Sequence, residues 1–229
     1  MKNTASRIPE IDLLRALALI LMILYHFIYD LDFFTSAPVQ VDSWYWFVEG
    51  KISAVLFIFL AGVSSGFSHH PFRNAVKILS WALIITLLTY IAMPESYIRF
   101  GILHFLGVMA LLYPFLQKRS TAFLSFYSLF ALILGFVLSN TYISGPWLLP
   151  LGVYYPGFST IDIYPFFPYS GVSALGILFY RFKYVSSDLQ ASYSLPSIIE
   201  KMSKHSLLIY LIHQPILLSI LFLVQKTFF

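Results

Sequence analysis

The chain has 229 residues, of which 59% are hydrophobic, 19% are aromatic and only 10% are charged, and its mean hydropathy is +0.80. This balance excludes an ordinary soluble globular domain and predicts an integral membrane protein. The chain has no cysteine, which excludes disulfides, a catalytic thiolate and cysteine-based metal or redox sites. The net charge of +4 does not indicate a nucleic-acid partner, because the basic residues fall in short loops.

Seven apolar segments follow one another along the chain, each near the roughly 20 residues that cross a bilayer as a helix. They cover residues 12–32, 46–68, 75–93, 101–117, 122–140, 164–182 and 205–225. We therefore predict an all-α, polytopic membrane protein with about seven transmembrane helices and one transmembrane domain over residues 1–229. The first segment is too long for a cleavable signal and lacks a small-residue cleavage site.

A further apolar run, GPWLLPLGVYYPG, lies between the fifth and sixth segments, from Gly145 to Gly157. Proline and glycine interrupt it too often for a spanning helix, yet it is too apolar for a free loop. We expect it to be interfacial or re-entrant.

The basic residues predict the orientation, because loops rich in Lys and Arg stay in the cytoplasm. With a cytoplasmic N-terminus, eleven of the fourteen Lys and Arg residues lie inside, and only Lys51, Arg99 and Lys226 lie outside. We therefore predict that the N-terminus is cytoplasmic and that the C-terminus is outside.

The first segment, EIDLLRALALILMILYHFIYDLDFF, carries ionisable residues among its apolar ones. Arg15 and His26 are eleven residues apart, close to the about 10.8 residues of three helical turns, so they share a face at a separation of roughly 16 to 17 Å. Asp30 follows one turn later on that face. Such groups are costly in a membrane unless they face protein or water, which indicates a functional site. An anchoring arginine, a packing histidine and a solvated aspartate remain open as alternatives.

Other polar residues add candidates for substrate contacts. His104 lies near the outer end of the fourth segment, Asp162 lies at the predicted outer face, and His213 lies near the middle of the last segment. We predict no metal site, because His69 and His70 have no carboxylate near them in sequence and fall in a predicted cytoplasmic loop.

Four blocks of the sequence carry a resemblance. They read RIPEIDLLRALALILMILYHFIYDLDFF, FGILHFLGVMALLYP, FSTIDIYPFFPYSGVSALGILF and KHSLLIYLIHQPILL. Together they resemble bacterial and archaeal relatives of the heparan-alpha-glucosaminide N-acetyltransferase catalytic domain. Arginine, ten residues and then histidine also resembles the motif of the membrane O-acyltransferases, and Arg15 and His26 are the matching positions. The resemblance implies a transferase in the plasma membrane of a prokaryote, which takes acyl groups from cytoplasmic acetyl-CoA and passes them to a glycan-like acceptor outside.

Acyl transfer to an alcohol or amine needs a base, and histidine suits this role at neutral pH. We predict that His26 is the base and that Asp30 orients it. Direct transfer is favoured, and an acetyl-histidine intermediate is left open. Arg15 lies about one phosphopantetheine length from His26, so we expect it to bind the phosphates of CoA with other cytoplasmic cations. The further candidates are Arg73, Lys77, Lys118, Arg119, Arg181 and Lys204.

A proton-coupled secondary transporter of a small solute is the alternative function, in which buried His and Asp residues relay protons. The partners that we expect are acyl-CoA, the acceptor and the lipid bilayer. The sequence leaves the identity of the acceptor, the length of the acyl chain and a homo-oligomer open.

Overall fold

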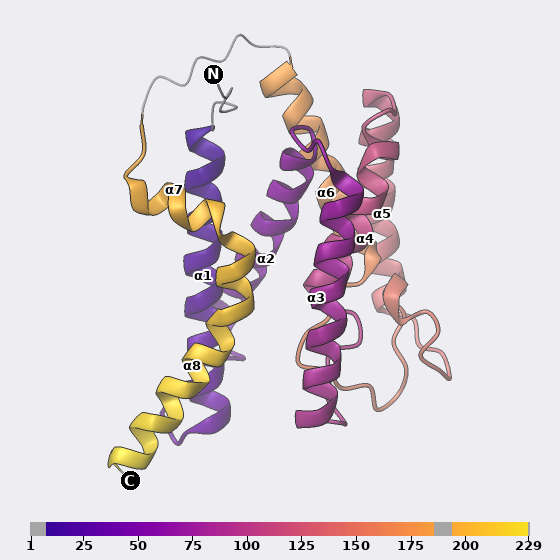
Figure 1. Cartoon of the computed structure of the whole chain (residues 1–229). Helices are drawn as coiled ribbons and strands as arrows, with labels where there is room; N and C mark the ends of the chain where they lie inside the picture. Colours follow the sequence, from indigo (N-terminus) through magenta and orange to yellow (C-terminus); the bar gives the residue numbers. More distant parts are fainter. Residues whose placement is uncertain (1–7, 186–193, 229) are drawn as a thin grey trace. The chain divides into compact units, whose positions relative to one another are not determined.

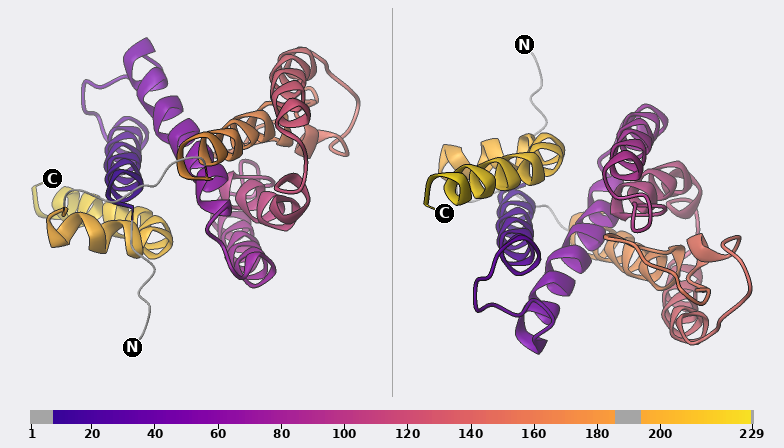
Figure 2. Two further views of the ribbon diagram at one scale, coloured as in Figure 1. Left: turned by 90° about the horizontal axis from the view of Figure 1, so that it is seen from above. Right: turned by 90° about the horizontal axis from the view of Figure 1, so that it is seen from below.

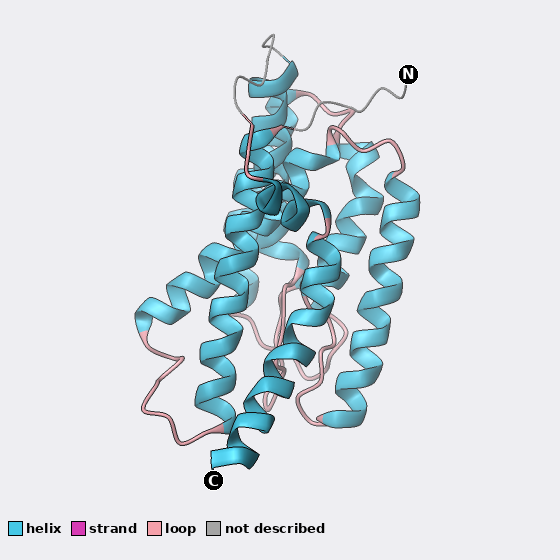
Figure 3. Cartoon of the chain, turned by 60° about the vertical axis from the view of Figure 1, so that its left-hand side comes forward, coloured by secondary structure: helices cyan, strands magenta, loops and turns pink. Residues whose placement is uncertain are grey.

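The computed structural model of the chain describes residues 8–185 and 194–228, and in this part the chain is helical, without a named strand (Figures 1 and 3). The helices are α1 (Pro9–Phe34), α2 (Trp44–Ser65), α3 (Pro71–Ala92), α4 (Ile102–Leu116), α5 (Thr121–Ser139), α6 (Phe166–Tyr180), α7 (Ser197–Lys204) and α8 (Ser206–Phe228). A 3-10 turn, η1 (Leu149–Leu151), precedes α6, and a π-helical turn, η2 (Arg181–Val185), follows it. The all-α prediction is thus confirmed for the described residues.

A helix occupies each of the seven predicted segments, but the described helices differ in length. Five of them are long and apolar enough to cross a membrane, namely α1, α2, α3, α5 and α8 up to Gln225. The other two, α4 and α6, have 15 residues each, or about 22 Å of helix against a hydrocarbon core of about 30 Å. The protein therefore has the helices of an integral membrane protein, whereas the count of seven spans is not confirmed, and the orientation stays a prediction.

Local sequence explains why these two helices are short. The backbone of Gly101 is extended, and α4 begins at the next residue. In α6 the backbone is non-helical at Phe167, directly before Pro168, because the residue before a proline is pushed out of the helical region. The predicted segments 101–117 and 164–182 agree with the bounds of α4 and α6 to within two residues.

The segment from Gly145 to Gly157 contains no spanning helix, as predicted. Its helical content is the single turn η1, which ends at Gly152 with a φ of 109°, a value that favours glycine. Tyr142 and Tyr154 form an isolated parallel bridge across it. Leu149 is buried, so the segment packs on the protein, and its position in a membrane stays a prediction.

The described chain forms two compact units. The first combines Met1–Phe57 with Leu189–Phe229 and holds α1, the N-terminal part of α2, α7 and α8. The second, Ile58–Asp188, holds the rest of α2, α3, α4, α5 and α6. The single domain over residues 1–229 stays a prediction.

In the first unit, α1 packs against both α7 and α8 (Figure 2). Pro9 starts α1 with a backbone that is already set for a helix, and Glu10 and Asp12 place negative charge at its positive end. Ala18 and Leu19 are fully buried. The small side chain of Ala18 lets its carbonyl oxygen accept a hydrogen bond from Ser53 of α2 at 3.1 Å.

In the second unit, α5 pairs with α6 and α3 pairs with α4. The C-terminal part of α2 crosses α6 at two glycines, where the backbones approach closely. A Cβ on Gly62 would lie 2.1 Å from the carbonyl oxygen of Ser173, and a Cβ on Gly176 would lie 2.2 Å from that of Phe59. Contacts of this kind between small residues are typical of packed membrane helices.

Candidate functional site

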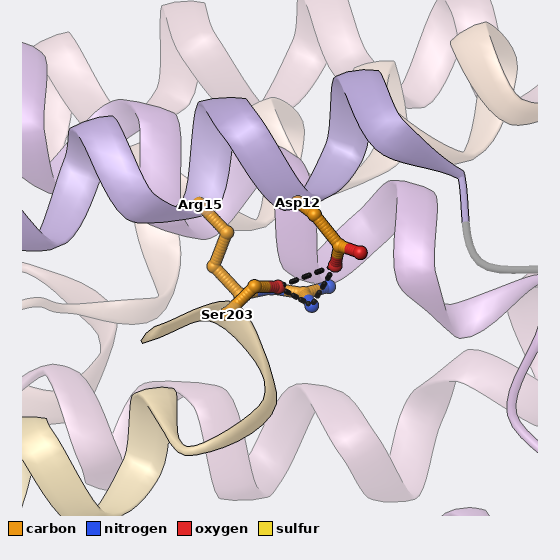
Figure 4. Close-up of polar contacts among 3 residues, drawn as sticks. All are labelled: Asp12, Arg15 and Ser203. Atoms are coloured by element: carbon orange, nitrogen blue, oxygen red, sulfur yellow. Dashed lines mark hydrogen bonds and ion pairs between the residues drawn. The ribbon is translucent and has the colours of Figure 1, made fainter. Parts of the chain in front are cut away.

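Arg15 joins α1 to the short helix α7 (Figure 4). Its Nη1 donates a hydrogen bond to Ser203 Oγ at 2.8 Å and lies 3.8 Å from Asp12 Oδ1. Ser203 Oγ in turn donates to Asp12 Oδ1 at 2.6 Å. Ser203 and Asp12 are buried, so this triangle holds α7 on α1, and an anion that binds Arg15 shares it with a carboxylate.

His26 of α1 lies against His213 of α8, 187 residues further along the chain. The ring centroids are 4.7 Å apart and the rings meet edge to face at 81°. His26 is half-buried and His213 is buried. The two histidines that sequence reasoning named separately are therefore neighbours in the first unit.

Each imidazole is held by its own helix. Nδ1 of His26 is 2.8 Å from the carbonyl oxygen of Met22, and Nδ1 of His213 is 2.5 Å from that of Tyr210. A carbonyl oxygen can only accept, so both Nδ1 atoms carry a proton in the neutral rings. Each Nε2 therefore keeps its lone pair, which is the form that a general base needs.

Asp30 is buried on α1, one turn after His26, but its partner is on α8. Gln214 Nε2 donates a hydrogen bond to Asp30 Oδ1 at 2.6 Å, whereas the Nδ1 of His26 bonds to Met22. The orienting bond that we predicted for Asp30 is thus made by a main-chain carbonyl in this structure. Gln214 is a residue that sequence reasoning missed, and its place directly after His213 was the available signal.

His104 and Asp162 lie together at the N-terminus of α4, in the second unit. The backbone N–H of Gly101 donates to His104 Nδ1 at 3.3 Å, so His104 Nε2 carries the proton and donates to Thr86 Oγ1 at 3.2 Å. Asp162 Oδ2 accepts from the N–H of Ile102 at 3.0 Å. Both side chains cap a helix here, and a substrate contact for either one stays a prediction.

The expected CoA-binding cations fall into two groups. Five lie at the same end of the second unit, where α2, α4 and α6 end and α3 and α5 begin (Figure 1). Arg181 is bonded there through its Nη2 to the carbonyl oxygen of Gln117 at 2.6 Å, and the other four are exposed: Arg73, Lys77, Lys118 and Arg119. Arg15 and the exposed Lys204 of α7 belong to the first unit.

A family model described as heparan-alpha-glucosaminide N-acetyltransferase, catalytic, matches residues 7–215. The chain belongs to this family. The resemblance inferred from the four sequence blocks is therefore confirmed, and the family is one of membrane acetyltransferases. No curated protein and no solved structure matched the chain. The heparan-alpha-glucosaminide N-acetyltransferase match includes all of α1 and α8 up to Pro215, so it contains both histidines, Asp30 and Gln214.

Proposed function

We propose that the protein is a membrane acyltransferase that moves an acetyl group from cytoplasmic acetyl-CoA to a hydroxyl or amine of an extracytoplasmic, glycan-like acceptor. Membership of an N-acetyltransferase family supports this reaction class. The observation that carries the proposal is the pair of imidazoles on α1 and α8, whose Nδ1 atoms are held by carbonyl oxygens. A base with a fixed tautomer and a neighbouring imidazole suits proton removal from an acceptor.

In the proposed step, His26 Nε2 takes the proton of the acceptor O–H or N–H. The acceptor oxygen or nitrogen then bonds to the thioester carbonyl carbon, the carbon–sulfur bond breaks, and the sulfur leaves as the thiolate of CoA. The proton on His26 passes to that thiolate or to water. His213 lies beside His26. Because the Nδ1 of His213 is bound to the carbonyl oxygen of Tyr210, its ring is fixed and holds the ring of His26 in place by contact. An acetyl-histidine intermediate would use the same Nε2 as the nucleophile.

For the donor, we propose that Arg15 binds a phosphate of CoA with Lys204, which follows Ser203 on α7. Arg15 and His26 are separated by roughly 16 to 17 Å along α1, which is close to the reach of an extended phosphopantetheine arm. For the cations of the second unit, a CoA contact stays a prediction: Arg73, Lys77, Lys118, Arg119 and Arg181. Reporter fusions in the loop at Lys118 test the predicted orientation and are expected to report cytoplasm.

The experiment that tests the function uses purified protein in detergent micelles. Acetyl-CoA is expected to raise the thermal midpoint more than equal concentrations of ATP, and CoA release in the presence of sugars is expected to exceed that of a His26→Gln variant. Equal stabilisation by acetyl-CoA and ATP, with no CoA release, would contradict an acyltransferase.

A proton-coupled secondary transporter is the second candidate. Buried carboxylate oxygens without a hydrogen-bond partner favour it, namely Oδ2 of Asp30 on α1 and both oxygens of Glu49 on α2. A relay needs groups that exchange protons across the membrane. Proteoliposomes distinguish the two: a transporter moves protons with its solute and ignores acetyl-CoA, whereas the transferase consumes acetyl-CoA without a proton gradient.

A further inference from the structure

Helices α1 and α8 leave three buried hydrogen-bond acceptors without a partner. They are Asp30 Oδ2, Gln214 Oε1 and His213 Nε2. Asp30 is 1% exposed and His213 is 7% exposed, so bulk water does not supply the missing hydrogen bonds. An unpaired buried acceptor is unfavourable, and three of them on adjoining residues indicate a place where a ligand supplies the missing donors.

The orientation of Gln214 is fixed by its neighbour. A carboxylate oxygen cannot donate, so the amide must turn its Nε2 toward Asp30 Oδ1, to which it donates at 2.6 Å. Gln214 Oε1 is consequently left as an acceptor. His213 Nε2 is an acceptor for the same reason, because its Nδ1 donates to Tyr210. All three unpartnered atoms therefore require donors.

These acceptors adjoin the proposed base. The pair formed by His26 and His213 and the pair formed by Asp30 and Gln214 are neighbouring contacts between α1 and α8. His26 and Asp30 are four residues apart, which is about 6 Å along the helix. A sugar ring is of this size, so a ring bound to Asp30 and Gln214 can place one hydroxyl or amine next to the imidazoles.

We propose that Asp30, Gln214 and His213 form the subsite for the acceptor, which binds a sugar ring through two donors on neighbouring carbon atoms. Asp30 and Gln214 accept from one pair of donors, and His213 Nε2 accepts from the group that reacts or from its neighbour. This inference rests on the proposed function, because it assigns the acceptor side of that reaction. Gln214 is then a specificity residue that touches the substrate.

The test measures direct binding of methyl β-D-glucopyranoside to the purified protein by saturation-transfer NMR, with its tetra-O-methyl analogue as the probe without donors. The wild type is expected to bind the first sugar and not the second. Gln214→Met keeps the side-chain length without the amide. It removes the acceptor Oε1 and the donor to the Asp30 carboxylate, so it is expected to weaken sugar binding at least tenfold. Asp30→Asn, which is isosteric and can still accept from Gln214, is expected to weaken it as well.

Gln225 supplies the matched control. Its Nε2 donates to the carbonyl oxygen of Phe34 at 2.8 Å, so it also joins α8 to α1, eleven residues after Gln214 on the same helix. Gln225→Met removes a similar tie without touching the subsite and is expected to bind the sugar like the wild type. Equal loss in both glutamine variants, or equal binding of the two sugars, would overturn the proposal. So would a wild type that binds neither sugar.

The readouts separate this inference from the proposed function. Sugar binding is measured without acetyl-CoA, so a protein that binds the sugar but releases no CoA contradicts the reaction and leaves the subsite in place. In the active enzyme, Gln214→Met is expected to raise the KM for the sugar and to leave the KM for acetyl-CoA unchanged. A raised KM for acetyl-CoA in this variant would place Gln214 on the donor side and refute the assignment.

Discussion

Replacement of His26 by glutamine is the sharpest test of the chemistry. Glutamine keeps much of the volume and a hydrogen-bonding group but has no proton acceptor of suitable basicity. A positioned base contributes about 10² to 10⁴ in rate, or about 2.7 to 5.4 kcal/mol of activation free energy. The bond of 2.8 Å from His26 Nδ1 to the carbonyl oxygen of Met22 holds Nε2 in its basic form in the resting protein. We therefore expect His26→Gln to lower the transfer rate by about 10² to 10⁴.

The same reasoning predicts a smaller and non-additive effect at His213. His213 lies 4.7 Å from His26 between ring centroids and is assigned to the acceptor subsite rather than to the base, so His213→Gln should cost less than His26→Gln. Because both histidines meet the same acceptor, their effects should not add in the double variant. The assay is CoA release at saturating acetyl-CoA, with acetyl-CoA binding measured in parallel to establish that the donor still binds. If His26→Gln binds acetyl-CoA normally and keeps half of the wild-type rate or more, the base lies elsewhere.

Three further predictions concern the supports of the site. Arg15→Ala should weaken acetyl-CoA binding on the order of tenfold through the loss of a charge-assisted phosphate contact. Asp12→Asn removes the carboxylate 3.8 Å from Arg15 and should tighten acetyl-CoA binding by a factor of up to about five. Isothermal calorimetry measures both affinities, and tighter binding by Arg15→Ala than by Asp12→Asn would refute a phosphate role for Arg15. Ser203→Ala removes a donor to Asp12 and an acceptor for Arg15, and should lower the stability by about 1 to 3 kcal/mol, which a reduced thermal midpoint reports and an unchanged one contradicts. Gly176→Ala places a Cβ 2.2 Å from the carbonyl oxygen of Phe59 and should lower the stability by about 1 to 3 kcal/mol. A thermal midpoint equal to that of the wild type would contradict close packing of α2 on α6 at this glycine.

Much of the fold could be predicted from local sequence. Each apolar segment became a helix because length and hydropathy are local properties, and the glycine- and proline-rich run from Gly145 to Gly157 did not. The bounds of α4 and α6 lie within two residues of the predicted segments 101–117 and 164–182, but the non-helical backbone at Phe167 inside α6 was not predicted. Hydropathy does not mark that break, because the residues on both sides of it are apolar.

The candidate site was predictable along α1 but not between helices. The spacing of Arg15, His26 and Asp30 follows from helical geometry alone. Their partners, Ser203, His213 and Gln214, lie more than 180 residues away in sequence, and helical periodicity carries no information about that pairing. Asp30 illustrates the difference: its spacing from His26 suggested an orienting bond, whereas its hydrogen bond comes from Gln214 of α8.

The helix α1 also sets the order of the proposed reaction. Arg15, His26 and Asp30 occupy one continuous helix, so their separations of roughly 16 to 17 Å and about 6 Å are set by helical rise alone and hold whatever the packing of the two units. A donor anchored at Arg15 presents its thioester carbon at His26 with the thiol on the Arg15 side. An acceptor anchored at Asp30 approaches from the opposite end of the helix, so only the acetyl group has to pass the imidazoles, and CoA can leave toward the side from which it entered.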